Sequence, residues 1–225
     1  MVFVYFFHEG VQKKYEYIGK MKGVKDEQAF FVVAAACNDT VAAAMELGRV
    51  FIWDKISKCN MRIPTRTLHW HRCAPSMIIT PFGALLSGGK ESTLVKYSLT
   101  PSLLPHLQAN ILTIGLSEDG SIASILLDDN SVHFVLLASM TVMSSAKALH
   151  SRRNGLPTSL LSLVPDPLHP EDVIISGYPG RLHWINVNSG ITTETVGIIL
   201  SPFKYFSHLF LWYFLKLLLI CCYFL

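Results

Sequence analysis

Leu68–His71 reads Leu-His-Trp-His, and Leu85–Tyr97 reads Leu-Leu-Ser-Gly-Gly-Lys-Glu-Ser-Thr-Leu-Val-Lys-Tyr. Within this stretch, short apolar runs are joined by polar turns that contain glycine. Valine and aromatic residues favour strands, and glycine supplies the positive φ that tight turns need. The same order of runs and turns recurs roughly every forty to fifty residues along the chain, which is the period of a β-propeller blade.

Four such windows can be aligned by their turns, and each reads strand, turn, strand, turn, strand. Alternation between apolar and polar residues is weak, as expected for strands that are buried on both faces. The expected strands are Phe30–Cys37, Val41–Met45 and Val50–Asp54; Met77–Thr80, Ala84–Ser87 and Leu94–Tyr97; Ile111–Leu116, Ile122–Leu127 and Val132–Val135; and Leu160–Val164, Val173–Ser176 and Leu182–Ile185. An outer fourth strand is expected in the connectors near Arg62–Leu68, Leu103–Leu107 and Met140–Ala148.

These windows predict an all-β fold, namely an incomplete β-propeller of about four blades over residues 28–197. An unrelated β-sandwich also has short strands at regular spacing, and the alignment of turns alone does not separate the two folds. Four windows of a larger ring cannot close it, and the exposed blade edges would invite pairing with other strands. The pattern therefore indicates an incomplete chain or an incomplete gene model.

Composition places the chain among globular proteins of low charge. Of its 225 residues, 16% are charged and 51% are hydrophobic. The hydrophobic fraction is large enough to form a core. The formal net charge of +3 is too small to indicate nucleic-acid binding by itself. The five cysteines include no Cys-x-x-Cys pair, so a reducing compartment is expected rather than a disulfide framework.

The segment Ser87–Tyr97 resembles the end of a WD-repeat blade, with Glu91 where aspartate is usual and Tyr97 where tryptophan is usual. In such blades a histidine, a serine, an acid and an aromatic residue form a buried hydrogen-bond chain between strands. Buried polar groups need partners, and a closed chain of this kind satisfies them. The resemblance assigns the structural hydrogen-bond chain to His71, Ser87, Glu91 and Tyr97.

The resemblance narrows to the family of WD repeat-containing protein 75, nucleolar proteins of the small-subunit processome. It is strongest at Leu68–His71, Leu85–Ser92 and Leu104–Leu107, and the later turn Ser176–Leu182 is similar. This resemblance implies a non-catalytic scaffold without a cofactor, located in the nucleus and nucleolus. It also implies membership of the t-UTP subcomplex, support of RNA polymerase I transcription, and a role in pre-rRNA processing. The implied partners are other t-UTP and small-subunit processome proteins, pre-rRNA and small nucleolar RNA.

Three side chains in the same region offer a different chemistry. His69, His71 and Cys73 alternate, so on a strand they would share one face and could supply three ligands to a zinc ion. Their spacing is not a recognised zinc pattern, and structural histidines are the favoured interpretation. The turn Ser87–Ser92 superficially resembles a phosphate loop but lacks the required glycine–lysine spacing. No catalytic residue is predicted.

RNA contact is assigned to two arginines, Arg152 and Arg153, in the loop that is expected at Ser151–Thr158. Contacts from these side chains to phosphates would be independent of sequence and sensitive to salt. Ordinary solvated surface is the competing interpretation, and the low density of charge favours it.

The two ends of the chain are expected to stand outside the repeat. Residues 1–27 form an N-terminal segment of undetermined structure, and residues 198–225 form an apolar tail for which a helix is expected. Residues 207–225 carry one formal charge, Lys216, and about twenty apolar residues can cross a bilayer. A tail-anchored membrane protein with a cytosolic or nucleoplasmic β domain is therefore the alternative. Translated intron or frame-shifted sequence is the favoured explanation of the tail.

Overall fold

The structure is a computed structural model that describes residues 2–8, 11–17, 31–58, 63–98, 100–146, 160–177 and 181–197. Within these ranges every helix-or-strand element is a β-strand. Four sheets contain four strands each, and we refer to them as blades 1 to 4. The described part of the chain is therefore all-β, as the sequence predicts for the repeat region.

The blades follow one another along the chain, and each strand pairs antiparallel with the next strand in sequence. Blade 1 comprises β3 (Phe31–Cys37), β4 (Thr40–Met45), β5 (Val50–Asp54) and β6 (Arg66–Leu68). Blade 2 comprises β7 (Ser76–Ile79), β8 (Leu85–Gly88), β9 (Val95–Tyr97) and β10 (Pro101–Leu103). Blade 3 comprises β11 (Ile111–Leu116), β12 (Ile122–Leu127), β13 (Val132–Leu136) and β14 (Thr141–Ala146). Blade 4 comprises β15 (Leu160–Pro165), β16 (Asp172–Gly177), β17 (Arg181–Asn186) and β18 (Thr192–Gly197).

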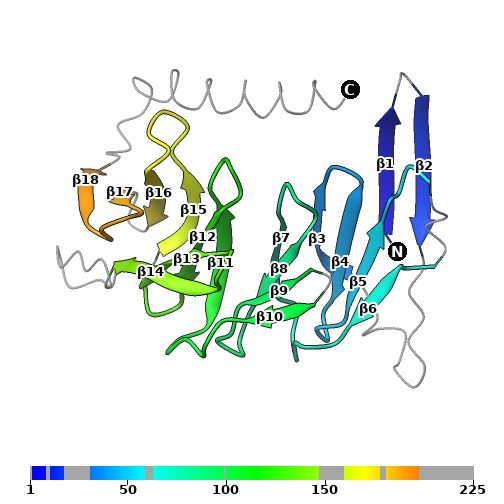
Figure 1. Ribbon diagram of the computed structural model, residues 1–225, viewed down its shortest axis with the longest axis horizontal. Helices are drawn as coiled ribbons and strands as arrows, with labels where there is room; N and C mark the ends of the chain where they lie inside the picture. The colour runs from blue at the N-terminus through cyan, green and yellow to red at the C-terminus, as the bar shows by residue number, and fades with distance from the viewer. Residues whose placement is uncertain are drawn as a thin grey trace.

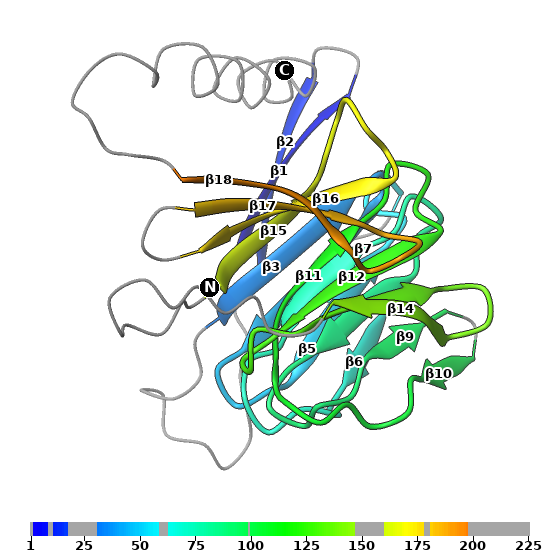
Figure 2. The ribbon, with the colours of Figure 1, turned by 90° about the vertical axis from the view of Figure 1, so that its left-hand side faces the viewer.

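The blades stand side by side in a row, with blade 1 and blade 4 at its two ends (Figure 1). The first strands of successive blades, β3, β7, β11 and β15, contact one another, so they form the inner edge of the row. In the side view, the first strands β3, β11 and β15 lie together, and the outer strands β6, β10 and β14 lie away from them (Figure 2). This arrangement is an incomplete β-propeller of four blades.

The hydrophobic core lies between neighbouring blades rather than inside any one of them. Between blades 1 and 2, Ile52 packs with Leu85 and Val95. Between blades 2 and 3, Leu94 packs with Ile125, and between blades 3 and 4, Phe134 packs with Ile175. Because each central strand is covered on both sides, its residues are buried almost continuously, which explains the weak alternation in the sequence.

A polar contact also joins each pair of neighbouring blades. Arg66 Nη1 donates to the Ser98 carbonyl at 3.2 Å, Lys96 Nζ donates to the Leu137 carbonyl at 2.7 Å, and Ser144 Oγ donates to the Val187 carbonyl. In each case the acceptor is the first residue after the third strand of the following blade. The three contacts therefore share one acceptor position, whereas the donors lie on the fourth strand for Arg66 and Ser144 and on the third strand for Lys96. The sequence analysis did not predict these contacts.

The predicted strands of all four windows are present, and their ends differ from the prediction by at most one residue. One outer strand is displaced, since β10 occupies Pro101–Leu103 rather than Leu103–Leu107. Leu104 and Leu107 are instead buried in the core between blades 2 and 3, and their N–H groups donate to the carbonyls of Leu94 and Ser92. Burial of these two leucines outweighs the formation of an edge strand.

The structure describes part of the N-terminal segment but none of the predicted apolar tail. Within the N-terminal segment, β1 (Val2–His8) and β2 (Val11–Tyr17) pair as an antiparallel hairpin, which the sequence analysis did not predict. This hairpin lies at the blade 1 end of the row (Figure 1). The predicted apolar tail, residues 198–225, lies outside the described residues.

Candidate functional site

The predicted site residues gather where the connector between blades 1 and 2 enters β7. Strand β6 ends at Leu68 and β7 begins at Ser76, and no strand is formed between them. His71 is 2% exposed, whereas its neighbours Trp70 and Arg72 are exposed. The connector therefore directs one imidazole inward and the flanking side chains outward.

His71 joins two side chains of blade 2. Its Nε2 lies 2.8 Å from Ser87 Oγ on β8, and its Nδ1 lies 2.9 Å from Glu91 Oε2 in the β8–β9 turn. The other oxygen of Glu91, Oε1, accepts the Arg72 N–H at 2.7 Å. The structure thus brings three of the four predicted members of the chain into direct contact.

The electrostatics of Glu91 favour its charged form. Burial alone would raise the pKa of this carboxyl group, but hydrogen bonds from the Arg72 N–H and the His71 ring outweigh burial and lower the pKa below its ordinary value of 4.5. A carboxylate at Glu91 is an acceptor only, so His71 donates through Nδ1–H. In a neutral imidazole with this tautomer, Nε2 accepts the Ser87 hydroxyl.

Tyr97, the fourth predicted member, is 2% exposed on β9 and packs in the core between blades 1 and 2. Its hydroxyl group is buried and makes no hydrogen bond of standard geometry with any described residue. Burial raises the pKa of Tyr97 to about 12, partly offset by the nearby Ser87 hydroxyl. Tyr97 therefore lies beside the His71–Ser87–Glu91 cluster without a direct bond to it.

The cluster has the order of contacts of a serine–histidine–acid catalytic triad, but its serine and histidine are too buried to meet a substrate. A serine nucleophile must meet its substrate, and the triad histidine must reach the substrate's leaving group. Ser87 is 0% exposed and His71 is 2% exposed. The arrangement can fasten the connector to blade 2, and it cannot reach a substrate in this conformation.

Gly48, in the β4–β5 turn, fits closely against the buried histidine. Its φ is +77°, and a Cβ atom at this position would lie 2.0 Å from the His71 carbonyl oxygen. Glycine meets both requirements, since it adopts positive φ readily and has no Cβ. A hydrogen bond from the Ala74 N–H to the Glu46 carbonyl, at 2.9 Å, holds the same turn to the connector. The sequence analysis expected strands on both sides of this turn, at Val41–Met45 and Val50–Asp54, but did not predict this contact.

The zinc alternative rested on a strand that the structure does not contain. His69 is exposed, Cys73 is half-buried, and both ring nitrogens of His71 already have partners. No three histidine, cysteine or acidic side chains in the described part of the chain lie where they could hold a metal ion together. The prediction that His69, His71 and Cys73 share one face is therefore wrong, because the connector bends here and does not form a strand.

A buried acid, which the sequence analysis missed, lies in blade 4. Asp166 is 6% exposed and accepts the Trp184 Nε1–H at 2.9 Å and the Leu168 N–H at 2.8 Å. Burial opposes ionisation of Asp166, but these hydrogen bonds outweigh it and lower its pKa. The available signal was an aspartate within the Pro165–Pro170 loop followed by a tryptophan on the third strand.

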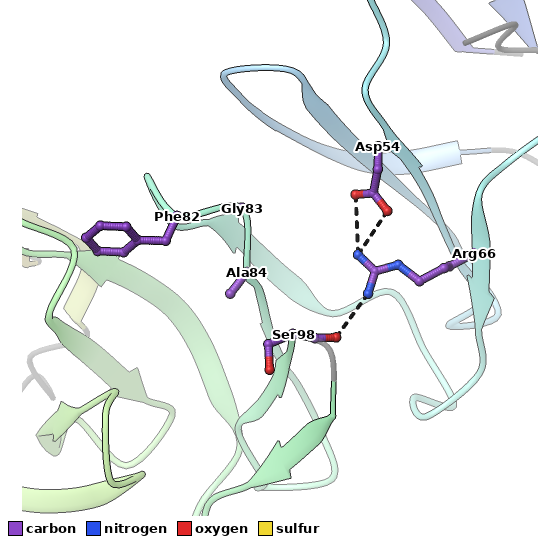
Figure 3. A pocket seen from close by; sticks show the side chains of 6 residues that line it. All are labelled: Asp54, Arg66, Phe82, Gly83, Ala84 and Ser98. Carbon is purple, nitrogen blue, oxygen red and sulfur yellow. Dashed lines mark hydrogen bonds and ion pairs between the residues drawn. The ribbon is translucent and has the colours of Figure 1, made fainter. Parts of the chain in front are cut away.

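The described residues also line a pocket of about 450 Å³ between blades 1 and 2, at the end opposite His71 (Figure 3). Arg66 crosses it, bonded to Asp54 at 3.2 Å and to the Ser98 carbonyl. Phe82, in the β7–β8 turn, is 81% exposed at its margin. Arg66 and Asp54 form an ion pair on the pocket wall, and Arg66 also binds the following blade, so the arrangement serves contact between blades. The buried Arg66 Nε has no hydrogen-bond partner among the described residues.

Two further predictions concern the membrane and RNA. In the ranges that the structure describes, no helix is long and apolar enough to cross a membrane, and residues 207–225 fall outside those ranges. The predicted RNA contacts Arg152 and Arg153 also lie outside the described residues.

Comparison with known proteins found a relative in sequence and a similar structure. No protein-family model matches the chain. U3 small nucleolar RNA-associated protein 17 from Schizosaccharomyces pombe (strain 972 / ATCC 24843) is 29% identical over 128 residues, which is 55% of this chain. The chain spans only 16% of the length of that relative. That relative is named for its association with U3 small nucleolar RNA, and the similarity does not single out WD repeat-containing protein 75.

The structure is also similar to a chain of the "Crystal Structure of Mitotic Checkpoint Complex". The TM-score is 0.60 and the identity is 14%, over 75% of this chain and 54% of that one. At this identity the likeness concerns the fold alone. It agrees with the four blades described above and shows that they form part of a β-propeller.

Proposed function

We propose that this chain is part of a non-catalytic WD-repeat scaffold in ribosome biogenesis. The observation that carries the proposal is the 29% identity to a U3 small nucleolar RNA-associated protein in a chain that folds as propeller blades. A propeller presents turns at both ends of its blades as rigid docking surfaces, and partners bind there without a reaction. The relative's name suggests ribosome biogenesis as the process, and the propeller fold suggests a scaffold as the role.

The proposal extends to the steps that the sequence resemblance implies. The chain acts in assembly of the small-subunit processome, in pre-rRNA processing, and in support of RNA polymerase I transcription within the nucleolus. Its partners are other t-UTP and processome proteins, with pre-rRNA and small nucleolar RNA in the same particle. The buried His71–Ser87–Glu91 cluster, with Tyr97 beside it, supports a structural use of the polar residues.

Depletion followed by rescue tests this function. Loss of the protein should lower the amount of 18S rRNA and cause its precursors to accumulate, and the tagged chain should co-purify with U3 RNA. Ser87→Ala should restore 18S rRNA in proportion to the amount of folded protein, because Ser87 is assigned no chemistry. Unchanged 18S rRNA after depletion would refute the process, and complete loss of rescue by stable Ser87→Ala protein would refute the non-catalytic role.

The location of the same tagged protein in cells distinguishes the scaffold from the tail-anchored alternative. Nucleolar foci are expected for the scaffold, and a membrane rim is expected for an anchor at residues 207–225. No described residue favours the anchor, so we place it second.

A further inference from the structure

The connector that buries His71 also presents a surface. Trp70 is 48% exposed, although tryptophan is usually mostly buried, and Arg72 is exposed on the other side of His71. Lys90, which is also exposed, immediately precedes Glu91, whose carboxylate binds both the His71 ring and the Arg72 N–H. These contacts bring Trp70, Arg72 and Lys90 to the same end of blade 2.

The backbone beneath this surface is held from three directions. Ser87 and Glu91 bind the two nitrogens of the His71 ring, and the Arg72 N–H donates to Glu91. From blade 1, Gly48 packs directly against the His71 carbonyl group. The indole and the guanidinium therefore project from a fixed support, and less conformational entropy is lost when a ligand binds to them.

The charges at this surface are available to a ligand. Both oxygens of Glu91 are engaged, one by the His71 ring and one by the Arg72 N–H. Among the described residues, no ion pair involves the Arg72 guanidinium or the Lys90 ammonium group. Glu46, in the neighbouring β4–β5 turn, is the opposing carboxylate on the blade 1 side. An exposed aromatic plane beside two unpaired cations is the combination that binds single-stranded nucleic acid.

We propose that Trp70, Arg72 and Lys90 form a contact site for single-stranded RNA. An unpaired base stacks on the Trp70 indole, and the neighbouring phosphates contact the two cations. This inference rests on the proposed role in a particle that contains RNA, and it names a ligand for a surface that the sequence analysis did not assign. Stacking requires an unpaired base, so the site should prefer single strands to duplexes.

Direct binding measurements with the full chain test this site. The probe is a fluorescent twelve-nucleotide RNA of mixed sequence, used as a single strand and as an annealed duplex. Trp70→Ala should weaken single-strand binding about tenfold. Arg72→Gln should lower the slope of RNA affinity against salt concentration by the amount expected for about one lost phosphate contact. Trp70→Phe should keep most of the affinity and lose the part of the fluorescence quenching that Trp70 contributes among the four tryptophans of the chain. Of the others, Trp53 is fully buried, and Trp184 is half-buried with its Nε1–H bound to Asp166.

The matched control is Phe82→Ala, which removes an 81% exposed aromatic ring from the opposite end of the same blade. This variant should bind RNA like the original chain. Equal RNA affinity of the original chain and Trp70→Ala would overturn the proposal, and so would equal losses in Trp70→Ala and Phe82→Ala. If Trp70→Ala lost a processome protein but no RNA affinity, the surface would be a protein site and the proposal would be wrong. The proposed function would survive each of these outcomes, because it is tested by 18S rRNA.

Discussion

At the scale of single residues, the account depends on His71. This side chain is buried and bonded at both nitrogens, so its removal would leave Ser87 Oγ and Glu91 Oε2 without their partner. A buried polar group left unsatisfied costs about 1–3 kcal/mol, and more when the group is charged. We expect His71→Ala to lower the free energy of unfolding by about 3 kcal/mol in urea titrations. His69→Ala, two residues away and exposed, is the control and should change stability by less than about 0.5 kcal/mol.

The lowered pKa of Glu91 makes a separate prediction about pH. A carboxyl group whose pKa is lower in the folded protein than in the unfolded chain stabilises the fold above its ordinary pKa. That contribution is lost as the pH falls from about 4.5 through the lower, folded value. Stability measured from pH 6 to pH 3 should therefore fall less steeply in Glu91→Gln than in the original chain. Identical pH profiles would show that Glu91 is not held by His71 and Arg72.

The residue types at this site were predictable, and their connections were only partly so. His71, Ser87 and Glu91 could be named because their spacing resembles a WD-repeat blade. The sequence could not show that Tyr97 lies beside the cluster without bonding to it, since that depends on where neighbouring strands place its ring. The partner of Gly48 was also hidden, because the contact joins residues of two different blades.

At the scale of elements, the turns and connectors carry the sharpest constraints. Gly48→Ala would place a Cβ atom 2.0 Å from backbone oxygen and would force alanine into positive φ. The left-handed backbone costs roughly 1–2 kcal/mol and overpacking a further 1–3 kcal/mol, so a loss of about 3 kcal/mol is expected. In Gly115→Ala the added atom meets the end of the Leu163 side chain at 2.3 Å, which can move. Thermal denaturation should rank Gly48→Ala as clearly the less stable of the two variants.

Contacts between blades are tested by Lys96, whose ammonium group donates to the Leu137 carbonyl of blade 3 at 2.7 Å. Lys96→Met keeps much of the apolar stem and removes the charged donor. A hydrogen bond to a charged group contributes about 1.5–3 kcal/mol, and this substitution should lower stability toward the lower end of that range. Lys90→Met, on the exposed β8–β9 turn, should leave the melting temperature unchanged; an equal effect of both variants would argue against the repeated contact.

Strand positions were more predictable than edge strands. The three inner strands of each blade follow from apolar runs between turn residues, and the structure has all of them. The edge strand β10 was displaced because Leu104 and Leu107 are drawn into the core between blades, which a pattern within one segment does not show. The β1–β2 hairpin was missed because the N-terminal segment does not share the repeat.

At the scale of the whole molecule, apolar packing between blades fixes their arrangement in a chain that has few charged residues. Each blade buries its apolar faces against its neighbours, so the cores between blades fix the row, and the exposed ends of the blades are left for partners. The surface around Trp70 is one such end. The four blades and the 29% identity to a U3 small nucleolar RNA-associated protein are the two observations on which the proposed scaffold role rests.

An experimental density map of processome particles purified through the tagged chain tests this account most directly. We expect density for four consecutive four-stranded blades within the particle, with the His71 imidazole between Ser87 and Glu91. Particles without density for the chain would contradict the proposed role. Blades in which these three side chains are separated and solvated would contradict the structural use of the cluster.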